Sequence, residues 1–181
     1  KKNNIQIHHT DDYSIFEHFI SIYNQTMQRD NAEEYYYFKE EFYKAIHDSL
    51  KGNYQVFYAT LDDQIIAVSI ILYANKQIHY HLSGSLSEYR SFAPTNLLLY
   101  EVALWGHQQG CKTFHLGGGL GSGNDNLYKF KAAFNRNSGL QFSIGKQIFN
   151  QALYDQLVEE RLAEDLSFDL ESKYFPLYRS K

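Results

Sequence analysis

Three runs of β-branched and aromatic residues follow one another with two residues between them, and they constrain the fold more than any other feature of the sequence. The runs cover residues 54–61, 64–74 and 77–83, with Asp62-Asp63 and Asn75-Lys76 at the connections. Two polar residues between such runs are typical of a tight turn between antiparallel strands. The sequence therefore predicts a three-stranded antiparallel meander at the centre of the fold.

Helices and further strands are predicted on both sides of this meander. Apolar residues at helical spacing indicate amphipathic helices, and alternating apolar residues indicate short strands. A sheet built in this order contains antiparallel and parallel pairs and is covered by helices on both faces. We therefore expect an α/β (α+β) fold with a mixed sheet. The expected helices cover residues 14–29, 38–49, 95–109, 125–134 and 153–166, and the further strands cover 4–8, 112–116 and 140–144.

Composition and charge limit the class of protein. The chain has 181 residues, 44% of them apolar, which suits one globular domain. Its net charge of -4 gives no overall field for binding a polyanion. Apolar stretches such as 65–74 and 97–105 fall short of the ~20 residues that cross a bilayer, and no apolar signal segment follows Lys1. With a single cysteine, Cys111, these features predict a cytoplasmic protein without a membrane span.

A glycine-rich turn lies between a predicted strand and a predicted helix. Residues 117–125 read Gly-Gly-Gly-Leu-Gly-Ser-Gly-Asn-Asp. Because glycine has no side chain, a ligand can reach the backbone N–H groups, and the following helix N-terminus adds partial positive charge. The spacing differs from that of nucleotide-binding glycine motifs, and a connection that only needs positive φ is the alternative. The turn favours a site for a phosphate or a developing oxyanion. The candidate ligand-binding residues here are Gly117, Gly118, Gly119, Gly121 and Asp125.

The helix predicted after this turn carries a lysine on its apolar face. Leu127, Phe130 and Phe134 form the stripe that faces the core, and Lys131 falls on the same stripe, whereas Lys129 points to solvent. A lysine on a buried face needs a partner or a function, although its ammonium can also reach water past a buried stem. We therefore predict that Lys131 is an active-site cation.

The third strand of the meander carries two histidines. Alternation places His79, His81 and Ser83 on one face and the even-numbered residues 78–82 on the other. An imidazole can take a proton near neutral pH, which an attacking ammonium requires. No helical His-Glu-x-x-His or Cys-His spacing accompanies these histidines, so no metal site is expected. His81 is the candidate base, with a structural role as the alternative, and His115 beside the glycine turn has the same two interpretations.

Five segments together resemble the Fem-type branch of the GNAT superfamily, and the predicted order of elements is similar to that of GNAT acyltransferases. The resemblance implies a GNAT-like domain over residues 1–150, with a central β-meander, and a C-terminal helix and tail over 151–181 packed on the same domain. Fem-type enzymes usually contain two GNAT-like halves. This chain, which starts at Lys1 without Met, looks like the second, so we expect an N-terminal half outside it. The five segments are 26–29, 35–38, 80–85, 116–119 and 127–131.

The same resemblance implies an activity. Fem-type enzymes transfer an amino acid from aminoacyl-tRNA to the stem-peptide amine of a peptidoglycan precursor. Phe130-Lys131 resembles the family's Phe-Lys element, whose lysine steadies the tetrahedral intermediate, and Lys131 and His81 are therefore the expected catalytic residues. Tyr80, Ser83, Phe130 and Tyr128 are the expected substrate-binding residues. An acidic chain without an Arg/Lys stripe suits tRNA poorly, unless only the acceptor end is held or another half supplies the charge.

Two other interpretations stay open. In GNAT enzymes the place of residues 90–95 holds the turn that binds the pyrophosphate of acyl-CoA, of the form Arg/Gln-x-x-Gly-x-Gly/Ala. Here Arg90 and Thr95 are the candidate cofactor-binding residues, but Ala93 replaces the first glycine. The chain is then an N-acyltransferase that uses acyl-CoA, or a non-catalytic half that packs on a partner domain through the stripe 16–27. Beyond an aminoacyl-tRNA or acyl-CoA donor, the sequence indicates no cofactor.

Overall fold

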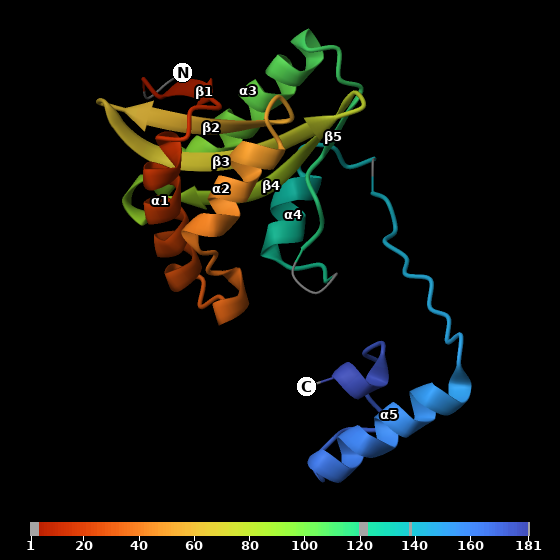
Figure 1. Ribbon diagram of the computed structural model, residues 1–181. Coiled ribbons are helices and arrows are strands. Elements are labelled where there is room, and N and C mark those ends of the chain that lie inside the picture. Colours follow the sequence, from red (N-terminus) through yellow and green to blue (C-terminus); the bar gives the residue numbers. More distant parts are fainter. Residues whose placement is uncertain (1–3, 120–122, 138, 181) are drawn as a thin grey trace. The chain divides into compact units, whose positions relative to one another are not determined.

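The computed structural model describes residues 4–119, 123–137 and 139–180 (Figure 1). The chain divides into two compact units, residues 1–135 and 136–181. The first unit contains a sheet with its covering helices. The second contains one longer helix followed by a C-terminal turn.

One five-stranded mixed sheet forms the first unit. Its strands lie in the order β1-β2-β3-β4-β5; the first four pair antiparallel, and β5 pairs parallel with β4. The predicted mixed sheet with a central antiparallel meander is therefore confirmed. The strands are β1 (Gln6–Thr10), β2 (Tyr54–Leu61), β3 (Gln64–Ala74), β4 (Gln77–Ser85) and β5 (Thr113–His115).

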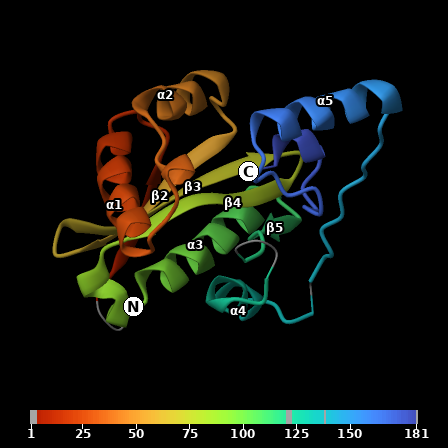
Figure 2. The ribbon, with the colours of Figure 1, turned by 90° about the horizontal axis from the view of Figure 1, so that it is seen from below.

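Helices cover both faces of this sheet, as Figure 2 shows from below. Two of them, α1 and α2, lie on one face, and α3 lies on the other. Each begins and ends within about two residues of the position that the apolar spacing predicts. The helices of this unit are α1 (Ile15–Arg29), η1 (Glu34–Tyr36), α2 (Glu40–Ser49), η2 (Ser87–Phe92), α3 (Pro94–Gln108) and α4 (Asn126–Ala132).

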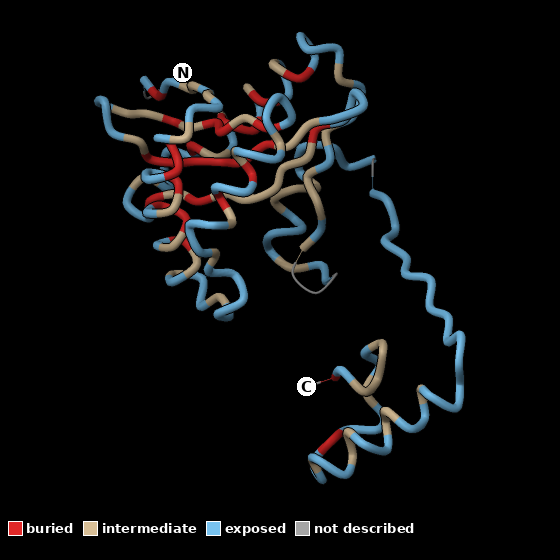
Figure 3. Tube along the Cα trace, in the orientation of Figure 1, coloured by how far each residue is buried: buried red, intermediate tan, exposed pale blue. Residues whose placement is uncertain are grey.

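The core consists of two apolar clusters, one on each face of the sheet, which appear as the red segments of Figure 3. Phe16, Phe19 and Tyr23 of α1 are 2%, 0% and 2% exposed and pack on β2 and β3. Leu98 and Val102 of α3 are completely buried against the opposite face. The stripe on α1 therefore faces this sheet, and its residues Ile20 and Met27 are partly buried.

A β-bulge in β4 changes which side chains share a face. Ile70 pairs with Leu82 and Ile71 pairs with Tyr80, so His81 is an extra residue in the strand. An inserted residue reverses the alternation beyond it. Leu82 therefore packs on the α1 side while Tyr80 packs on the α3 side. The prediction that Ser83 shares a face with His81 is wrong, because Ser83 follows the bulge and lies beside Tyr80.

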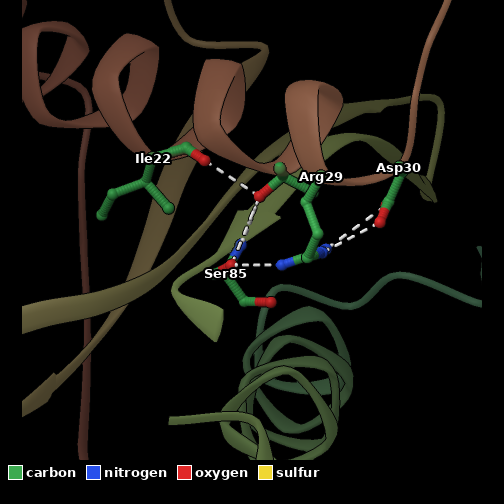
Figure 4. A network of polar contacts seen from close by, with 5 residues as sticks. Ile22, Arg29, Asp30 and Ser85 are labelled. Carbon is green, nitrogen blue, oxygen red and sulfur yellow. Dashed lines mark hydrogen bonds and ion pairs between the residues drawn. The ribbon is translucent and has the colours of Figure 1, made fainter. Parts of the chain in front are cut away.

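Helix α1 is fixed to the end of β4 by a buried polar network, which Figure 4 shows from close by. The Thr26 hydroxyl accepts a hydrogen bond from the Ser85 N–H at 2.9 Å and donates to the Ile22 carbonyl at 2.9 Å. Arg29 Nη1 donates to the Ser85 carbonyl at 2.9 Å. A Cβ added to Gly84 would lie 2.9 Å from the Ile22 carbonyl oxygen, so glycine permits this close approach. The end of β4 and the last turns of α1 thus form one rigid element.

The second unit is organised around α5 (Gln151–Glu164), which is followed by η4 (Leu177–Arg179). Tyr154 of α5 accepts a hydrogen bond from the Leu177 N–H at 2.9 Å, which fixes the tail to the helix. The strand predicted over residues 140–144 does not form, and Leu140 is 91% exposed. A strand needs a neighbouring backbone to bond, and the described residues of this unit contain no strand that could pair with it. No helix in the described ranges is long and apolar enough to span a membrane.

The network at the end of β4 gives a first prediction. Replacing Thr26 with valine keeps the volume of the side chain but leaves the buried Ser85 N–H without its acceptor. We expect the free energy of unfolding to fall by about 1–3 kcal/mol. The Thr26→Ser variant retains the hydroxyl and should lose much less. Urea denaturation of both variants measures the difference, and equal losses would contradict a role for the hydroxyl.

Candidate active site

The candidate site begins where β4 and β5 separate. The two strands pair only from Gln77 to His79 on β4 and from Thr113 to His115 on β5. Beyond His79, β4 continues to Ser85 with β3 as its ladder partner among the described residues. The chain after β5 leaves the sheet through the glycine turn and enters α4. One edge of β4 is therefore open beside this turn.

Glycines are required at two described positions of the turn. Gly117 has φ +75°, in the left-handed region that glycine adopts at little cost. A Cβ at residue 119 would lie 2.7 Å from the Gly123 carbonyl oxygen and would also overlap the Asp125 carboxylate. Asp125 is the N-cap of α4 and accepts a hydrogen bond from the Tyr128 N–H at 2.7 Å. A left-handed backbone thus explains Gly117 and close packing around the cap explains Gly119, while Gly118 meets no such neighbour and Gly121 lies outside the described residues.

Lys131 reaches back from α4 onto the turn. Its Nζ donates a hydrogen bond to the Gly118 carbonyl at 2.8 Å and lies 5.7 Å from the centre of the Tyr80 ring. Burial lowers the pKa of Lys131, and the Asp125 charge opposes that shift. Lys129 is exposed, as the helical spacing predicts, but the prediction that Leu127 and Phe134 face the core is wrong, because they are 39% and 40% exposed. The predicted cation is therefore beside the glycine turn, although the group that the turn presents to it is a carbonyl rather than an N–H.

The histidines of β4 lie on the face of the sheet that α2 covers. The ring of His81 is 6.4 Å from that of Phe42 on α2 and 5.8 Å from that of His79. Burial lowers the pKa of His81. Burial also lowers the pKa of His79, helped by the charges of His115, His81 and Lys131. Because a lowered pKa keeps an imidazole neutral, both rings can accept a proton near pH 7.

The pairing of His79 with His115 is a feature that the sequence did not reveal. Their Nδ1 atoms are 2.9 Å apart, and their rings stack at 5.1 Å between centroids. Each histidine is visible in its strand, but their contact depends on the register between β4 and β5, which no local pattern encodes. No group of three or more metal-ligating side chains is found within residues 4–119, 123–137 and 139–180.

The expected substrate-binding residues divide between the two sides of β4. Tyr80 and Phe130 pack with the cluster on the α3 side. Burial raises the pKa of Tyr80, and a hydrogen bond with the Ser83 hydroxyl opposes the shift. Tyr128 contributes its N–H to the Asp125 cap, while its side chain is 37% exposed. Tyr80 is thus the substrate-binding candidate in contact with Lys131.

The N-terminus of α3 offers few donors to an anion. Pro94 is the first helical residue and has no N–H, and Ala93 before it adopts φ +51°. The N–H groups of Asn96 and Leu97 bond to the Ala93 carbonyl at 3.1 and 3.5 Å. Within the described residues, Thr95 is left as the first-turn residue whose N–H has no backbone acceptor. Arg90 is exposed in η2 just before this turn.

Comparison with known families decides the assignment of this fold. Residues 4–132 match the sequence profile of the family described as "Acetyltransferase (GNAT) domain". The chain belongs to this GNAT family. The matched range ends at the last residue of α4, so it includes the open edge of β4, the glycine turn and Lys131. No relative with a curated description matches the sequence.

Solved structures share the GNAT fold at low sequence identity. An aminoglycoside acetyltransferase from an uncultured soil metagenomic sample, in complex with sisomicin, is 12% identical over 82% of this chain and 99% of its own, with a TM-score of 0.61. AAC(6')-Iy in complex with the bisubstrate analogue CoA-S-monomethyl-acetylneamine is 14% identical over 80% and 99%, with a TM-score of 0.60. FemX is 14% identical over 74% of this chain and 49% of its own, also at 0.60. At these identities the likeness concerns the fold alone.

Alanine substitutions at two neighbouring glycines test the packing of the glycine turn. In this GNAT domain the Gly119→Ala variant forces a methyl group against Asp125 and Gly123, whereas Gly118→Ala meets no atom within 4 Å. We expect Gly119→Ala to displace the cap of α4 and to lower the free energy of unfolding by about 1–2 kcal/mol. Gly118→Ala should stay within about 0.5 kcal/mol of the wild type. Thermal unfolding of the two variants makes the comparison, and equal stabilities would refute the packing argument.

Proposed function

We propose that this GNAT domain is an N-acyltransferase that moves an aminoacyl group from an ester donor to an amine. The observation that carries the proposal is the half-buried Lys131 ammonium on the glycine turn, 2.8 Å from the Gly118 carbonyl and next to the open edge of β4. In Fem-type enzymes, which this chain resembles, a lysine at the corresponding position stabilises the tetrahedral intermediate. The GNAT family and the position of this cation agree with that chemistry.

The proposed chemistry uses the cation at the moment when charge develops. A neutral amine attacks the ester carbonyl, and its oxygen becomes negative in the tetrahedral intermediate. A fixed ammonium in a partly buried site stabilises that charge more than water does, because it needs no reorientation. The Lys131 Nζ releases the Gly118 carbonyl and donates its hydrogen bond to the new oxyanion instead. The proposed substrate-binding residues are Tyr80, Ser83, Phe130, Tyr128, Gly117, Gly118, Gly119 and Asp125, together with Gly121, which lies outside the described residues.

Proton transfer is assigned to a neutral imidazole of β4. The attacking amine enters as an ammonium and must lose a proton before it becomes a nucleophile. His81 is one candidate because its lowered pKa keeps it unprotonated at neutral pH. It lies at the bulge on the α2 side, and its neighbour His79 lies nearer to the point where β5 leaves the sheet.

We favour an aminoacyl-tRNA ester over acyl-CoA as the donor. The α3 N-terminus has lost one N–H to Pro94, and the Asn96 N–H is bonded to the Ala93 carbonyl, so it is a poor site for a pyrophosphate. An aminoacyl ester needs no pyrophosphate contact. The net charge of -4 suits only the acceptor end of tRNA, with further charge supplied by an N-terminal half outside this chain. The acceptor that we propose is the stem-peptide amine of a peptidoglycan precursor, in the cytoplasm.

Acyl-CoA remains the second candidate donor for a specific reason. The bisubstrate analogue in the AAC(6')-Iy structure joins CoA to an acceptor, and that chain has this fold with a TM-score of 0.60. Arg90 and the Thr95 N–H could still meet a CoA phosphate at the start of α3. The interpretation as a non-catalytic half loses its support, since Phe16, Phe19 and Tyr23 are buried within the domain.

A paired substitution on α4 tests the role of the lysine. We expect Lys131→Met, which keeps the apolar stem, to lower the rate of amide formation about 10²–10³-fold. The matched control is Lys129→Met, which alters an exposed lysine on the same helix and should leave the rate unchanged. The rate is measured as transfer of a labelled amino acid from aminoacyl-tRNA to a lipid-linked precursor. Full activity in Lys131→Met would remove Lys131 from the mechanism.

The pH dependence follows from the same groups. Activity needs a neutral histidine and a protonated Lys131, so it should fall at acid pH as the histidine gains a proton and at alkaline pH as the lysine loses one. Because both pKa values are lowered, the acid midpoint should lie below 6.5 and the alkaline midpoint below 10.5. Lys131→Arg keeps its charge to higher pH and should move the alkaline limb upward. An alkaline limb that does not move would assign it to another group.

Calorimetry separates the two donors. Titration with acetyl-CoA up to millimolar concentration should give no binding heat if the α3 N-terminus cannot hold the pyrophosphate. A minimal mimic of the acceptor end, such as an aminoacyl-adenosine, should bind. Saturable acetyl-CoA binding that is weakened by Arg90→Ala would favour the acyl-CoA donor instead.

A further inference from the structure

The contact between His79 and His115 restricts how the two rings carry their protons. Their facing atoms are both Nδ1, at 2.9 Å. A hydrogen bond at this distance requires one Nδ1 to hold a hydrogen and the other to offer a lone pair. Two arrangements satisfy this condition. They differ in which ring has a free Nε2 that can accept a proton.

Burial distinguishes the two rings. His79 is half-buried in β4, while His115 is exposed at the end of β5. When His79 donates from Nδ1, its own Nε2 is unprotonated and His115 carries its hydrogen on Nε2, where water can exchange it. In the opposite arrangement the unprotonated Nδ1 of the half-buried ring accepts the bond from His115, so this ring has no free basic nitrogen. The first arrangement therefore puts the basic nitrogen on the partly buried ring and the exchangeable proton on the exposed ring.

We propose that His79 is the general base of the transfer reaction and that His115 is the positioning residue that holds it in the basic tautomer. The inference rests on the proposed acyl transfer to an amine. His115 accepts the Nδ1 hydrogen of His79, as a buried carboxylate does for the histidine of a hydrolase triad.

The proton balance of the reaction fits such a pair. The amine arrives as R-NH3⁺, and one proton moves to Nε2 of His79. The amine nitrogen then forms a bond to the ester carbon, the ester C–O bond breaks, and a second N–H proton moves to the leaving oxygen. One proton per turnover is therefore released. It leaves when Nε2 of His79 passes its proton to water after the products depart, while the Nδ1 hydrogen stays in the bond to His115, so the same tautomer serves the next turnover.

The contact with His115 favours His79 over His81 as the base, because it fixes which nitrogen of His79 is basic. Besides His115, the titratable groups that act on His79 are His81 on the same strand and Lys131 on α4. Both oppose a positive charge on His79, and burial does the same, so its pKa is lowered. Burial alone accounts for the lowered pKa of His81, whose ring lies toward Phe42. Lys131, the proposed oxyanion cation, is thus electrostatically linked to His79.

The tautomer can be measured without any substrate. Two-bond ¹H–¹⁵N spectra of the full chain near pH 7.5 report which nitrogen of each histidine carries hydrogen. We expect His79 as the Nδ1–H form and His115 as the Nε2–H form. In His115→Ala we expect His79 to lose this preference, and in His115→Asn, whose amide oxygen can accept the same hydrogen bond, we expect it to return. A wild-type His79 that carries its hydrogen on Nε2 would overturn the proposal.

Kinetics then test the two roles with the donor that the wild-type chain uses, aminoacyl-tRNA or acetyl-CoA. We expect His79→Gln to lower kcat about 10²–10⁴-fold. His115→Ala should lower kcat about 10-fold or more and shift the acid limb of the pH profile, while His115→Asn recovers most of the rate. The control His107→Ala alters an exposed histidine at the end of α3 and should leave kcat unchanged.

The outcomes separate this inference from the function on which it rests. Normal turnover in His79→Gln, or loss in His115→Ala with an unmoved pH profile, overturns the inference while the transfer activity stands. A strong loss in His81→Gln with a normal His79→Gln assigns the base to His81 and also overturns it. If the wild-type chain transfers from neither donor, the proposed function fails and the inference fails with it.

Discussion

The site depends on one constraint, which is that β4 has a ladder partner on both edges for only part of its length. Three residues of β4 pair with β5, and the remainder pairs with β3 alone among the described residues. Unpaired backbone groups beside a sheet are costly unless water or a ligand bonds them. Thr26 and Arg29 satisfy the last of them at Ser85. The intermediate stretch, around His81, is where we propose that substrate binds.

Side chains from both faces of β4 lie at this opening. The bulge at His81 keeps both histidines of the strand toward α2 and brings Tyr80 and Ser83 together toward α3. Lys131 reaches the opening from α4 and contacts the Tyr80 ring. A base on one side and a cation on the other suit a reaction in which a proton leaves the nucleophile while charge develops on the carbonyl oxygen.

The spacing of apolar residues predicted those parts of the structure that depend on a single helix or strand. The meander, the helices on its faces and the half-buried position of Lys131 followed from spacing along single elements. The bulge did not, because Ile78, Tyr80 and Leu82 alternate with His79 and His81 in the sequence as they would in a regular strand. The contact of His79 with His115 requires the register between two strands. Residues 140–144 alternate as a strand should, yet no strand lies beside them in the described part of their unit.

The bond from Lys131 to the Gly118 carbonyl has a consequence for the proposed reaction. Among the described residues, the Nζ of Lys131 already has a peptide oxygen as acceptor at 2.8 Å. An incoming carbonyl gains this charge only by becoming a better acceptor than a peptide oxygen, which a tetrahedral oxyanion is and a resting ester is not. In the proposed reaction the contact would therefore act as a threshold, because the cation leaves the peptide oxygen only when an oxyanion has formed.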